Sequence, residues 1–184
     1  MSTTPYRTLV FATLVQESAL SVGGNRPHGL VDSPLARDGR GRPVLRGSTL
    51  AGCFIASARH LVGPLPQAIT AGGIAAQRHG DKQALQSSAW RFAHAHPQTD
   101  NPSTGFYQHV SIDARTLAAK DYHLFNLEAL PGGTHWPFEL EIVPTPGTDF
   151  ATLEALAAAT LAQWQQPGGA RLGRGSQHGY GLCN

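Results

Sequence analysis

Glycine and proline confine regular secondary structure to a few stretches of this chain. They number 21 and 13 among 184 residues, so loops must occupy much of the sequence. Hydrophobic patterning in the remaining stretches predicts, in chain order, a strand at Tyr6–Gln16, a helix from Ser48 to about Val62, a strand at Phe106–Ile112, a projecting turn at Asp113–Tyr122, a return strand at His123–Leu130, a strand at Trp136–Val143, a helix from Thr148 or Asp149 to about Gln165, and a short strand at Tyr180–Leu182. The order β, α, β, β, α, β is that of the ferredoxin-like split βαβ motif. We expect a single α+β domain over residues 1–184.

Apolar residues three or four positions apart predict both helices. In the first helix Leu50, Phe54 and Ala58 form one face, and Ser48 is the expected N-cap. In the second helix a similar stripe covers residues 150–164. The topology is expected to place the first and last strands near the middle of one sheet, so that the two ends of the chain become neighbours.

Residues 60–105 are too irregular to extend this framework. They are rich in Gly, Pro, Gln and His, with a short helix expected near Gln83–Ala95. A segment this irregular inside a small domain is more often a functional insertion than a connector. Its His94-x-His96 pair leaves a zinc site open as one alternative, although no cysteine stands beside it.

Positive charge is concentrated at the two ends of the sequence. The net charge is only +2, but residues 1–60 hold seven arginines against three acids, and residues 166–184 hold two arginines and no acid. Brought together by the fold, these ends would suit a polyanion. Arginine outnumbers lysine twelve to two, which favours bidentate phosphate contacts. A GC-rich genome would produce the same ratio but not the clustering.

The sequence gives no indication of a membrane segment or of export. No window approaches 18 apolar residues, and no basic segment leads into an apolar run near Met1. The two cysteines, Cys53 and Cys183, form no disulfide framework. We therefore expect a cytoplasmic protein without a membrane partner.

The start of the first predicted helix can hold a phosphate. Free N–H groups and the macrodipole at a helix N-terminus favour an anion. Gly47 would let a phosphate approach the backbone, and the hydroxyls of Ser48 and Thr49 can donate to it. Arg46 adds positive charge at the same end. The alternative interpretation is a plain N-cap.

The stretch GGARLGRGSQHGYG at residues 168–181, called here the glycine-rich loop, is a second candidate for phosphate contacts. Closely spaced glycines expose backbone N–H groups in a nest that can hold an anion. The spacing fits neither the dinucleotide-binding pattern nor the P-loop. A flexible tail, with the histidine as a solvated loop residue, is the alternative. The candidate contacts are Arg171, Gly173, Arg174, Gly175 and His178.

Asp32 stands ahead of an arginine cluster in the segment DSPLARDGRGRPVLRGSTLAG. Arg37, Arg40 and Arg42 follow it and are further candidates for contacts with a polyanion. Asp-Ser-Pro is a turn signature, so the carboxylate can form an Asx-turn or a structural ion pair. In the functional alternative it holds a metal ion, or orients a ribose hydroxyl, beside a phosphate bound by arginine.

Four segments, in this order, resemble the RAMP superfamily of CRISPR-associated proteins, and most of all the backbone-filament subunit of type III effector complexes. The segments are VDSPLARDGRGRPVLRGSTLAG, QHVSIDARTLAAKDYHLFNLEALPGGTHWPFELEI, ALAAATLAQW and ARLGRGSQHGYG. The resemblance implies a modified ferredoxin-like (RRM-like) fold with a variable lid at 60–105, a thumb hairpin at 113–123 and the glycine-rich loop at 168–181. Ala51 departs from the pattern, since the family often has lysine there.

The resemblance also implies a function. Such a subunit polymerises along a CRISPR RNA (crRNA) with other effector subunits and further copies of itself, and its thumb wedges between the guide and a complementary single-stranded target RNA. In target-cleaving members an aspartate before the first helix is required for divalent-metal-dependent cleavage. Asp32 occupies that position, which implies a metal-dependent endoribonuclease that uses Mg²⁺ or Mn²⁺. The first helix's start, the arginine cluster and the glycine-rich loop would bind the RNA backbone.

Two alternatives within the family stay open. In one, the subunit is only a crRNA-binding scaffold, and Asp32 is a turn residue. In the other, it is a metal-independent crRNA-processing endoribonuclease that works by acid/base catalysis through His28 or His178. An unrelated RRM is disfavoured because the strands lack its signature.

Overall fold

The computed structural model describes residues 6–24, 31–70, 87–100, 102–113 and 115–184. Its elements are β1 (Thr8–Val15), α1 (Gly47–Val62), α2 (Gln67–Thr70), β2 (Trp90–Phe92), β3 (Gly105–Ile112), β4 (Ala119–Ala129), β5 (His135–Ile142), α4 (Phe150–Trp164), β6 (Ala170–Arg171), the 3₁₀ helix η1 (Ser176–His178) and β7 (Leu182–Cys183). Helices packed with antiparallel sheets are compatible with the expected ferredoxin-like class. None of the described helices combines the length and hydropathy that crossing a bilayer requires.

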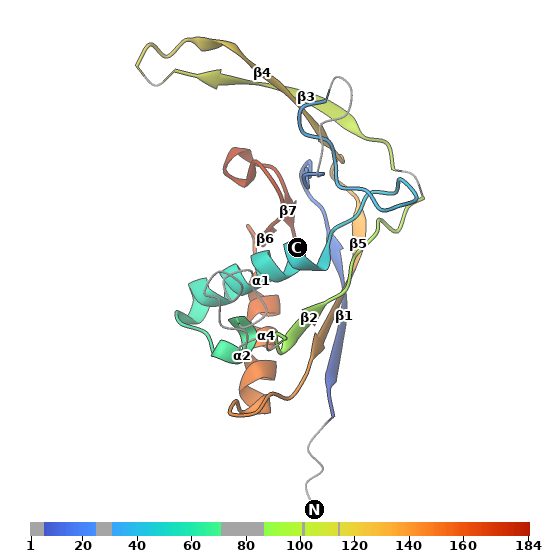
Figure 1. Ribbon diagram of the computed structural model, residues 1–184, viewed down its shortest axis with the longest axis vertical. Coiled ribbons are helices and arrows are strands. Elements are labelled where there is room, and N and C mark those ends of the chain that lie inside the picture. The colour runs from blue at the N-terminus through green and yellow to red at the C-terminus, as the bar shows by residue number, and fades with distance from the viewer. Residues whose placement is uncertain (1–5, 25–30, 71–86, 101, 114) are drawn as a thin grey trace, which may run out of the picture.

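The central element is the three-stranded sheet β1-β5-β2, in which β5 lies in the middle and runs antiparallel to both neighbours. Along β5, Trp136, Phe138 and Leu140 are buried and the residues between them are exposed, as a half-buried strand requires. Helices α1 and α4 lie on the buried side of the sheet and leave its other face open (Figure 1). The predicted strand at 136–143 is confirmed, shifted by one residue.

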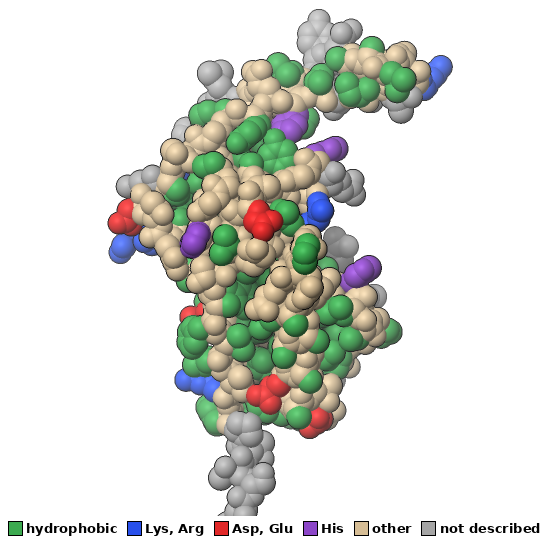
Figure 2. All heavy atoms as spheres, turned by 180° about the vertical axis from the view of Figure 1, so that it is seen from behind, with side chains coloured by type: hydrophobic (Ala, Val, Ile, Leu, Met, Phe, Trp, Pro, Cys, Tyr) green, Lys and Arg blue, Asp and Glu red, His purple; other side chains and the backbone are tan. Residues whose placement is uncertain are grey.

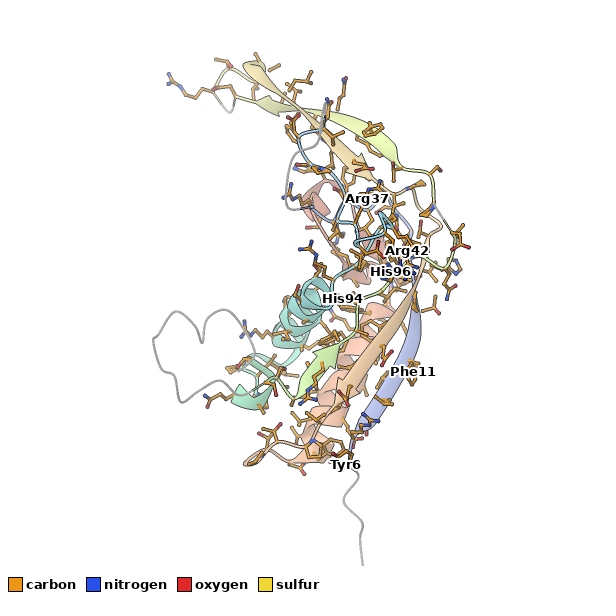
Figure 3. All side chains as sticks on the ribbon, turned by 45° about the vertical axis from the view of Figure 1, so that its right-hand side comes forward. Tyr6, Phe11, Arg37, Arg42, His94 and His96 are labelled. Atoms are coloured by element: carbon orange, nitrogen blue, oxygen red, sulfur yellow. The ribbon has the colours of Figure 1, made fainter. Side chains whose placement is uncertain are left out.

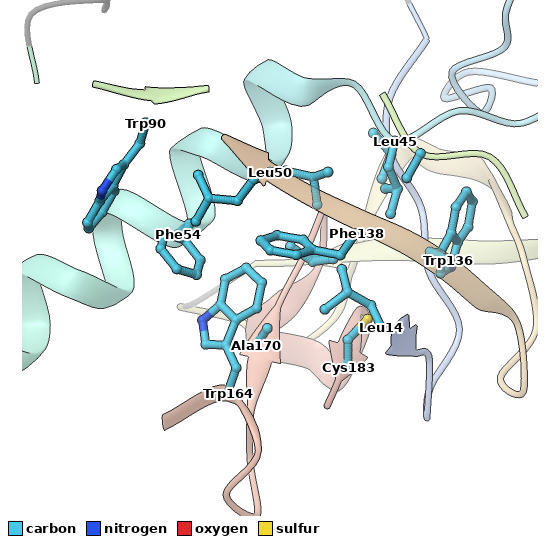
Figure 4. Packing of buried hydrophobic residues seen from close by; sticks show 14 of the residues in the cluster. Leu14, Leu45, Leu50, Phe54, Trp90, Trp136, Phe138, Trp164, Ala170 and Cys183 are labelled. Atoms are coloured by element: carbon cyan, nitrogen blue, oxygen red, sulfur yellow. The ribbon is translucent and has the colours of Figure 1, made fainter. Parts of the chain in front are cut away.

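Phe54 of α1 lies at the centre of the hydrophobic core (Figure 4). Its ring packs edge-on against Trp90 of β2 and Trp164 of α4, with ring centroids 5.3 and 5.0 Å away. Phe138 of β5 is 5.9 Å away. Both indole N–H groups find hydrogen-bond acceptors, so burying these large rings leaves no donor unpaired. The apolar faces predicted for the two helices therefore meet against the sheet.

The end of the chain differs from the expected topology. The last strand does not enter the central sheet: β6 and β7 form a two-stranded sheet of their own, and β1 is an edge strand. Gly181, with a φ of 70°, turns the backbone, so β7 begins after it rather than at Tyr180. Val15 and Asn184 nevertheless exchange backbone hydrogen bonds of 2.9 and 3.1 Å. The two ends of the chain are neighbours, as predicted. The prediction that the first and last strands lie near the middle of one sheet was wrong.

A second correction concerns residues 87–95, which contain no helix. Trp90–Phe92 form β2 and pair with the C-terminal end of β5. Trp90 is buried and Arg91 exposed, but three residues are too few for such alternation to be recognised in a sequence. The first part of the expected helix, residues 83–86, lies outside the described residues, as does much of the predicted lid.

The hairpin β3–β4 projects from the body of the molecule (Figures 1 and 2). A backbone hydrogen bond from Asp113 to Ala118 closes its turn at 2.8 Å. Strand β4 begins at Ala119, so part of the predicted projecting turn at 113–122 is strand. Large apolar side chains are exposed along the hairpin: Phe106, Val110, Ile112, Leu117, Leu124 and Phe125.

Gln16 fixes the point where the hairpin leaves the body. Its side chain is fully buried at the end of β1, and its amide nitrogen donates to the carbonyls of Leu130 and Pro131, just after β4. Its amide oxygen accepts the indole N–H of Trp136 in β5. A buried polar group with all its partners orders the elements it joins.

Candidate nucleic-acid interface

The loop at residues 32–46 is called here the arginine loop. Two of its arginines, Arg37 and Arg42 (Figure 3), form ion pairs with acidic side chains. Arg37 forms an ion pair with Glu128 of β4, which is 6% exposed. Burial alone would raise the pKa of this carboxyl, but hydrogen bonds from Leu35, Arg37 and Thr104 lower it below its usual value. Glu128 is therefore ionised at neutral pH and ties the loop to the hairpin.

Asp38 organises the tip of the arginine loop. One of its carboxylate oxygens accepts the backbone N–H groups of Arg40 and Arg42 at 2.8 and 2.9 Å, and the other accepts the Arg42 guanidinium at 3.0 Å. The hydrogen bond from the Arg42 backbone contributes most to a pKa of Asp38 below its usual value. The Arg40 side chain is exposed and forms no ion pair within the described residues. The RNA contacts expected of these arginines remain predictions.

Helix α1 begins earlier than expected, with Arg46 rather than Ser48 as its N-cap. Gly47 is its first residue, and the Gly47 N–H donates to Nδ1 of His94 at 2.9 Å. A Cβ at Gly47 would overlap a backbone carbonyl of β2, so glycine here lets the helix pack against the sheet. This structural role differs from the expected approach of a phosphate. Ser48 is exposed and Thr49 half-buried, and their RNA contacts remain predictions, as does that of Arg46.

His94 and His96 each form a hydrogen bond, and among the described residues neither belongs to a cluster of metal ligands. Nδ1 of His96 lies 3.1 Å from the Pro43 carbonyl oxygen. Across the described part of the chain, no three His, Cys, Asp or Glu side chains come together as metal ligands.

Asp32 lies exposed at the base of the hairpin. Its Oδ2 accepts the backbone N–H of Asn126 at 2.9 Å. The next residue, Ser33, exchanges backbone hydrogen bonds with Asn126 and Glu128 at 3.1 and 3.0 Å, so this segment runs beside β4. The backbone thus holds the carboxylate in a defined place. One exposed carboxylate in a fixed position fits a hydrated Mg²⁺ ion that also binds phosphate oxygens.

The glycine-rich loop reaches the same place. Nη1 of Arg174 donates to the Ser33 hydroxyl at 2.7 Å, and the guanidinium lies over Gly23, where a Cβ would collide with it. Nη1 of Arg171 donates to the Ser176 carbonyl at 2.7 Å. Within the described residues, neither arginine forms an ion pair with an acid. The fold therefore brings the Asp32 segment and the glycine-rich loop together.

The backbone conformation and close packing of this loop explain why it contains glycines. Gly173 and Gly175 have φ angles of 79° and 73°, the left-handed region that favours glycine. A Cβ at Gly173 would overlap the Ser21 carbonyl, and Gly175 packs against the ring of Tyr180. Phosphate binding by these two glycines remains a prediction. His178 is exposed at the end of η1, and its RNA contact also remains a prediction.

A pocket of about 420 Å³ opens between the hairpin, the Asp32 segment and the glycine-rich loop. Its lining includes three aromatic side chains that the sequence had not marked as functional, His109, Phe125 and Tyr180. The signal was the alternation along β3, which places Tyr107 and His109 on one face of the strand. Burial, and then the neighbouring Tyr107, raises the pKa of Tyr180, so its hydroxyl keeps its proton at neutral pH.

These features define an α+β protein with an arginine-bearing surface at the base of a projecting hairpin, a geometry suited to nucleic acid. A family model described as the RAMP superfamily matches residues 16–184, and the chain belongs to that superfamily. No curated protein matches the chain. Membership supports a CRISPR-associated, RNA-binding protein, since RAMP proteins generally bind crRNA within CRISPR complexes.

Proposed function

We propose that the protein is the backbone subunit of a type III CRISPR effector complex, which binds crRNA and cleaves complementary target RNA at regular intervals. Its partners would be the two RNAs, other effector subunits and further copies of this chain. The position of Asp32 carries the proposal: an exposed carboxylate at the base of the hairpin, next to the serine that Arg174 contacts. A carboxylate with an arginine held at the adjacent residue suits chemistry on a phosphodiester.

The projecting hairpin supports the proposal because it exposes large apolar side chains that suit insertion into a duplex. Phe106, Leu117 and Leu124 are 65%, 78% and 61% exposed, which is unusual for large apolar side chains on one short element. Apolar side chains inserted between base steps unstack and kink a nucleic-acid duplex. One hairpin per subunit would kink a guide–target duplex at regular intervals, beside one Asp32 each time.

In the proposed reaction the 2′-oxygen of the target attacks the adjacent phosphorus, and the bond from phosphorus to the 5′-oxygen breaks. The 2′-hydroxyl loses its proton and the 5′-oxygen gains one, which leaves a 2′,3′-cyclic phosphate and a 5′-hydroxyl. Arg174 would bind the phosphate, and Asp32 would hold a divalent cation, Mg²⁺ or Mn²⁺. The cation would offset the negative charge that develops on the phosphate.

The assembled complex with its guide and an end-labelled complementary RNA tests the proposal. Asp32→Asn removes the charge but keeps an oxygen that can accept the Asn126 N–H, and Asp100→Asn is the matched change at another exposed aspartate. We expect evenly spaced products from wild type and Asp100→Asn, and at least about a hundredfold slower cleavage by Asp32→Asn. EDTA should abolish the products while target binding is retained. Tight binding without cleavage by any protein would instead indicate a scaffold, with Asp32 as a turn residue.

His178 favours a second candidate, the metal-independent crRNA-processing endoribonuclease. It lines the same pocket as Arg174, and an imidazole near a guanidinium can support acid/base cleavage of RNA without a metal. His28, the other candidate residue, lies outside the described residues. Cleavage of precursor repeat RNA in chelator, lost in His178→Ala, would support this function, and an intact repeat would exclude it.

A further inference from the structure

Arg174 is exposed, yet three contacts hold it. Its backbone N–H donates to the Ser21 carbonyl at 2.8 Å, and its guanidinium lies against Gly23 and donates to the Ser33 hydroxyl. An exposed arginine side chain ordinarily keeps most of its rotamer freedom, and ordering it costs conformational entropy. The three contacts therefore indicate a function that depends on where the guanidinium lies.

Gly23 supports the flat face of the guanidinium. A Cβ on this glycine would lie 2.7, 2.8 and 2.8 Å from Nη2, Cζ and Nε of Arg174. These nearly equal distances mean that the plane of the group lies over the glycine, so any side chain at position 23 would push it away. Gly23 is not among the glycines with a positive φ, so its backbone does not demand glycine. The close approach of Arg174 accounts for a glycine here.

Ser33 holds one end of the guanidinium. Its hydroxyl accepts a hydrogen bond at 2.7 Å from Nη1 of Arg174, the terminal nitrogen on the same side as Cδ. Among the described residues this is the one hydrogen bond that the guanidinium forms. It leaves the other edge, Nε–H and Nη2–H, whose two parallel donors match two oxygens of a phosphate. Ser33 thus determines which edge of the guanidinium is presented.

The same two residues are tied to the segment that carries Asp32. Ser33 is the next residue, and Gly23 forms an antiparallel β-bridge with Leu35. The Asp32 carboxylate is itself bound to the backbone of β4. The backbone that positions the Arg174 guanidinium therefore also positions the carboxylate, and the two groups keep one relative geometry.

We propose that Gly23 and Ser33 are positioning residues for RNA cleavage, which hold Arg174 so that its Nε–Nη2 edge binds the scissile phosphate beside Asp32. The inference rests on the proposed function and assigns to it two residues that act only through Arg174. A pair of donors that is in place before the substrate arrives does not have to be ordered in the transition state. Without the two contacts, the positive charge stays at the site and its geometry is lost.

The Ser33 contact is tested with the assembled complex and its guide. Ser33→Ala removes the acceptor for Nη1, whereas Ser33→Thr keeps a hydroxyl. Ser87→Ala is the matched control, because the Ser87 hydroxyl also accepts from an arginine, Arg91 of β2, at the other end of the sheet from the hairpin (Figure 1). We expect Ser33→Ala to slow target cleavage roughly tenfold or more, Ser33→Thr to retain most of the rate, and the control to match wild type. An unchanged rate in Ser33→Ala would overturn the role of Ser33.

A double-mutant cycle determines whether Ser33 acts through Arg174. The variant with both Ser33→Ala and Arg174→Ala should cleave as slowly as Arg174→Ala alone, because without the guanidinium the serine has nothing to position. Losses that multiply in the double variant would mean that Ser33 contacts the RNA itself, which would overturn the inference. Ser33→Ala keeps the charge of Arg174, so it should leave the salt dependence of RNA binding unchanged.

Gly23→Ala displaces the guanidinium without removing a polar group. The added Cβ meets the far end of a flexible side chain, which can move aside, so the free energy of unfolding should change little. Cleavage should nevertheless slow as it does in Ser33→Ala. Gly52→Ala is the control, because a Cβ there meets open space. Cleavage by Gly23→Ala at the wild-type rate would overturn the role of Gly23.

The RNA-free protein separates this inference from the function on which it rests. NMR relaxation of the Arg174 Nε–H in the full chain reports whether the side chain is ordered. We expect an ordered group in wild type and Ser33→Thr and a mobile one in Ser33→Ala, and a mobile group in wild type would overturn the inference. Absence of cleavage by the wild-type complex would contradict the proposed function, and the same cycle measured as RNA affinity then decides whether Gly23 and Ser33 place Arg174 on a phosphate.

Discussion

The two arginine-bearing loops of the molecule are held in opposite ways. The arginine loop is held by charge, as in the ion pair between Arg37 and the buried Glu128. The glycine-rich loop is held by close backbone packing at its glycines, and its Arg174 contacts only a neutral hydroxyl, that of Ser33, among the described side chains. The first loop thus uses the guanidinium groups of Arg37 and Arg42 for its own structure, whereas Arg174 of the second loop has no acidic partner among the described residues.

Clustering of arginines in a sequence therefore does not identify the arginines that contact a ligand. A guanidinium paired with a carboxylate must give up that partner before it can bind phosphate, and the field of the pair is largely cancelled. A guanidinium that donates to a hydroxyl keeps its full charge. The smaller cluster, in the glycine-rich loop, is therefore the better candidate for RNA phosphates than Arg37 or Arg42.

The largest effect is expected from breaking the backbone packing of the glycine-rich loop. Gly181 has a φ of 70°, and a Cβ there would overlap the backbone carbonyl of Leu172, so Gly181→Ala should lower the free energy of unfolding by more than about 3 kcal/mol. Gly179 has a φ of 85° with open space around it, so Gly179→Ala should cost only about 1–2 kcal/mol. Urea denaturation of both variants checks this, and equal losses would show that packing does not hold the loop.

A smaller loss of stability is expected from removing the charge that holds the arginine loop. Glu128→Gln should lower the free energy of unfolding at pH 7 by about 2 kcal/mol, because it leaves Arg37 without its carboxylate. The same substitution at Glu139, exposed on the open face of β5, is the control and should change it by less than about 0.5 kcal/mol.

The pH dependence of that loss follows from the pKa of Glu128. Since the folded state lowers this pKa, the stabilisation is complete above the unfolded value of roughly 4.3 and is lost as the pH falls through the lower folded value. The stabilities of wild type and Glu128→Gln should therefore begin to approach each other as the pH falls below about 4. A difference that persists unchanged at pH 3 would mean that the ion pair is not its cause.

The sequence predicted the helices and strands that have a long hydrophobic pattern. It also predicted that two distant segments with distinctive residues lie close together. Alternation over eight residues revealed β5, and apolar spacing revealed α1 and α4. The proximity of Arg174 to the segment after Asp32 followed from the expected nearness of the chain's two ends. Three-residue β2 was missed because one buried ring and one half-buried ring are too few to show a period.

The partners of the site could not be predicted, because they depend on tertiary contacts between distant residues. Glu128 lies 91 residues after Arg37, and nothing local in the sequence indicates that this acid, rather than Asp32, holds the arginine. His109 and Tyr180 are 71 residues apart and meet only because β3 and the glycine-rich loop pack together. The hydrogen bond between the Gly47 N–H and Nδ1 of His94 likewise joins residues that lie 47 positions apart.

The contrast between the two loops is tested most directly by the salt dependence of RNA binding. The full chain, Arg174→Ala and Arg42→Ala are titrated with one single-stranded RNA over a series of KCl concentrations. Arg174→Ala should reduce the slope of log affinity against log salt by ~0.7, the value for one lost phosphate contact on a single strand. Arg42→Ala, whose guanidinium is paired with Asp38, should leave the slope unchanged. A slope that is reduced by Arg42→Ala and not by Arg174→Ala would contradict the contrast between the two loops.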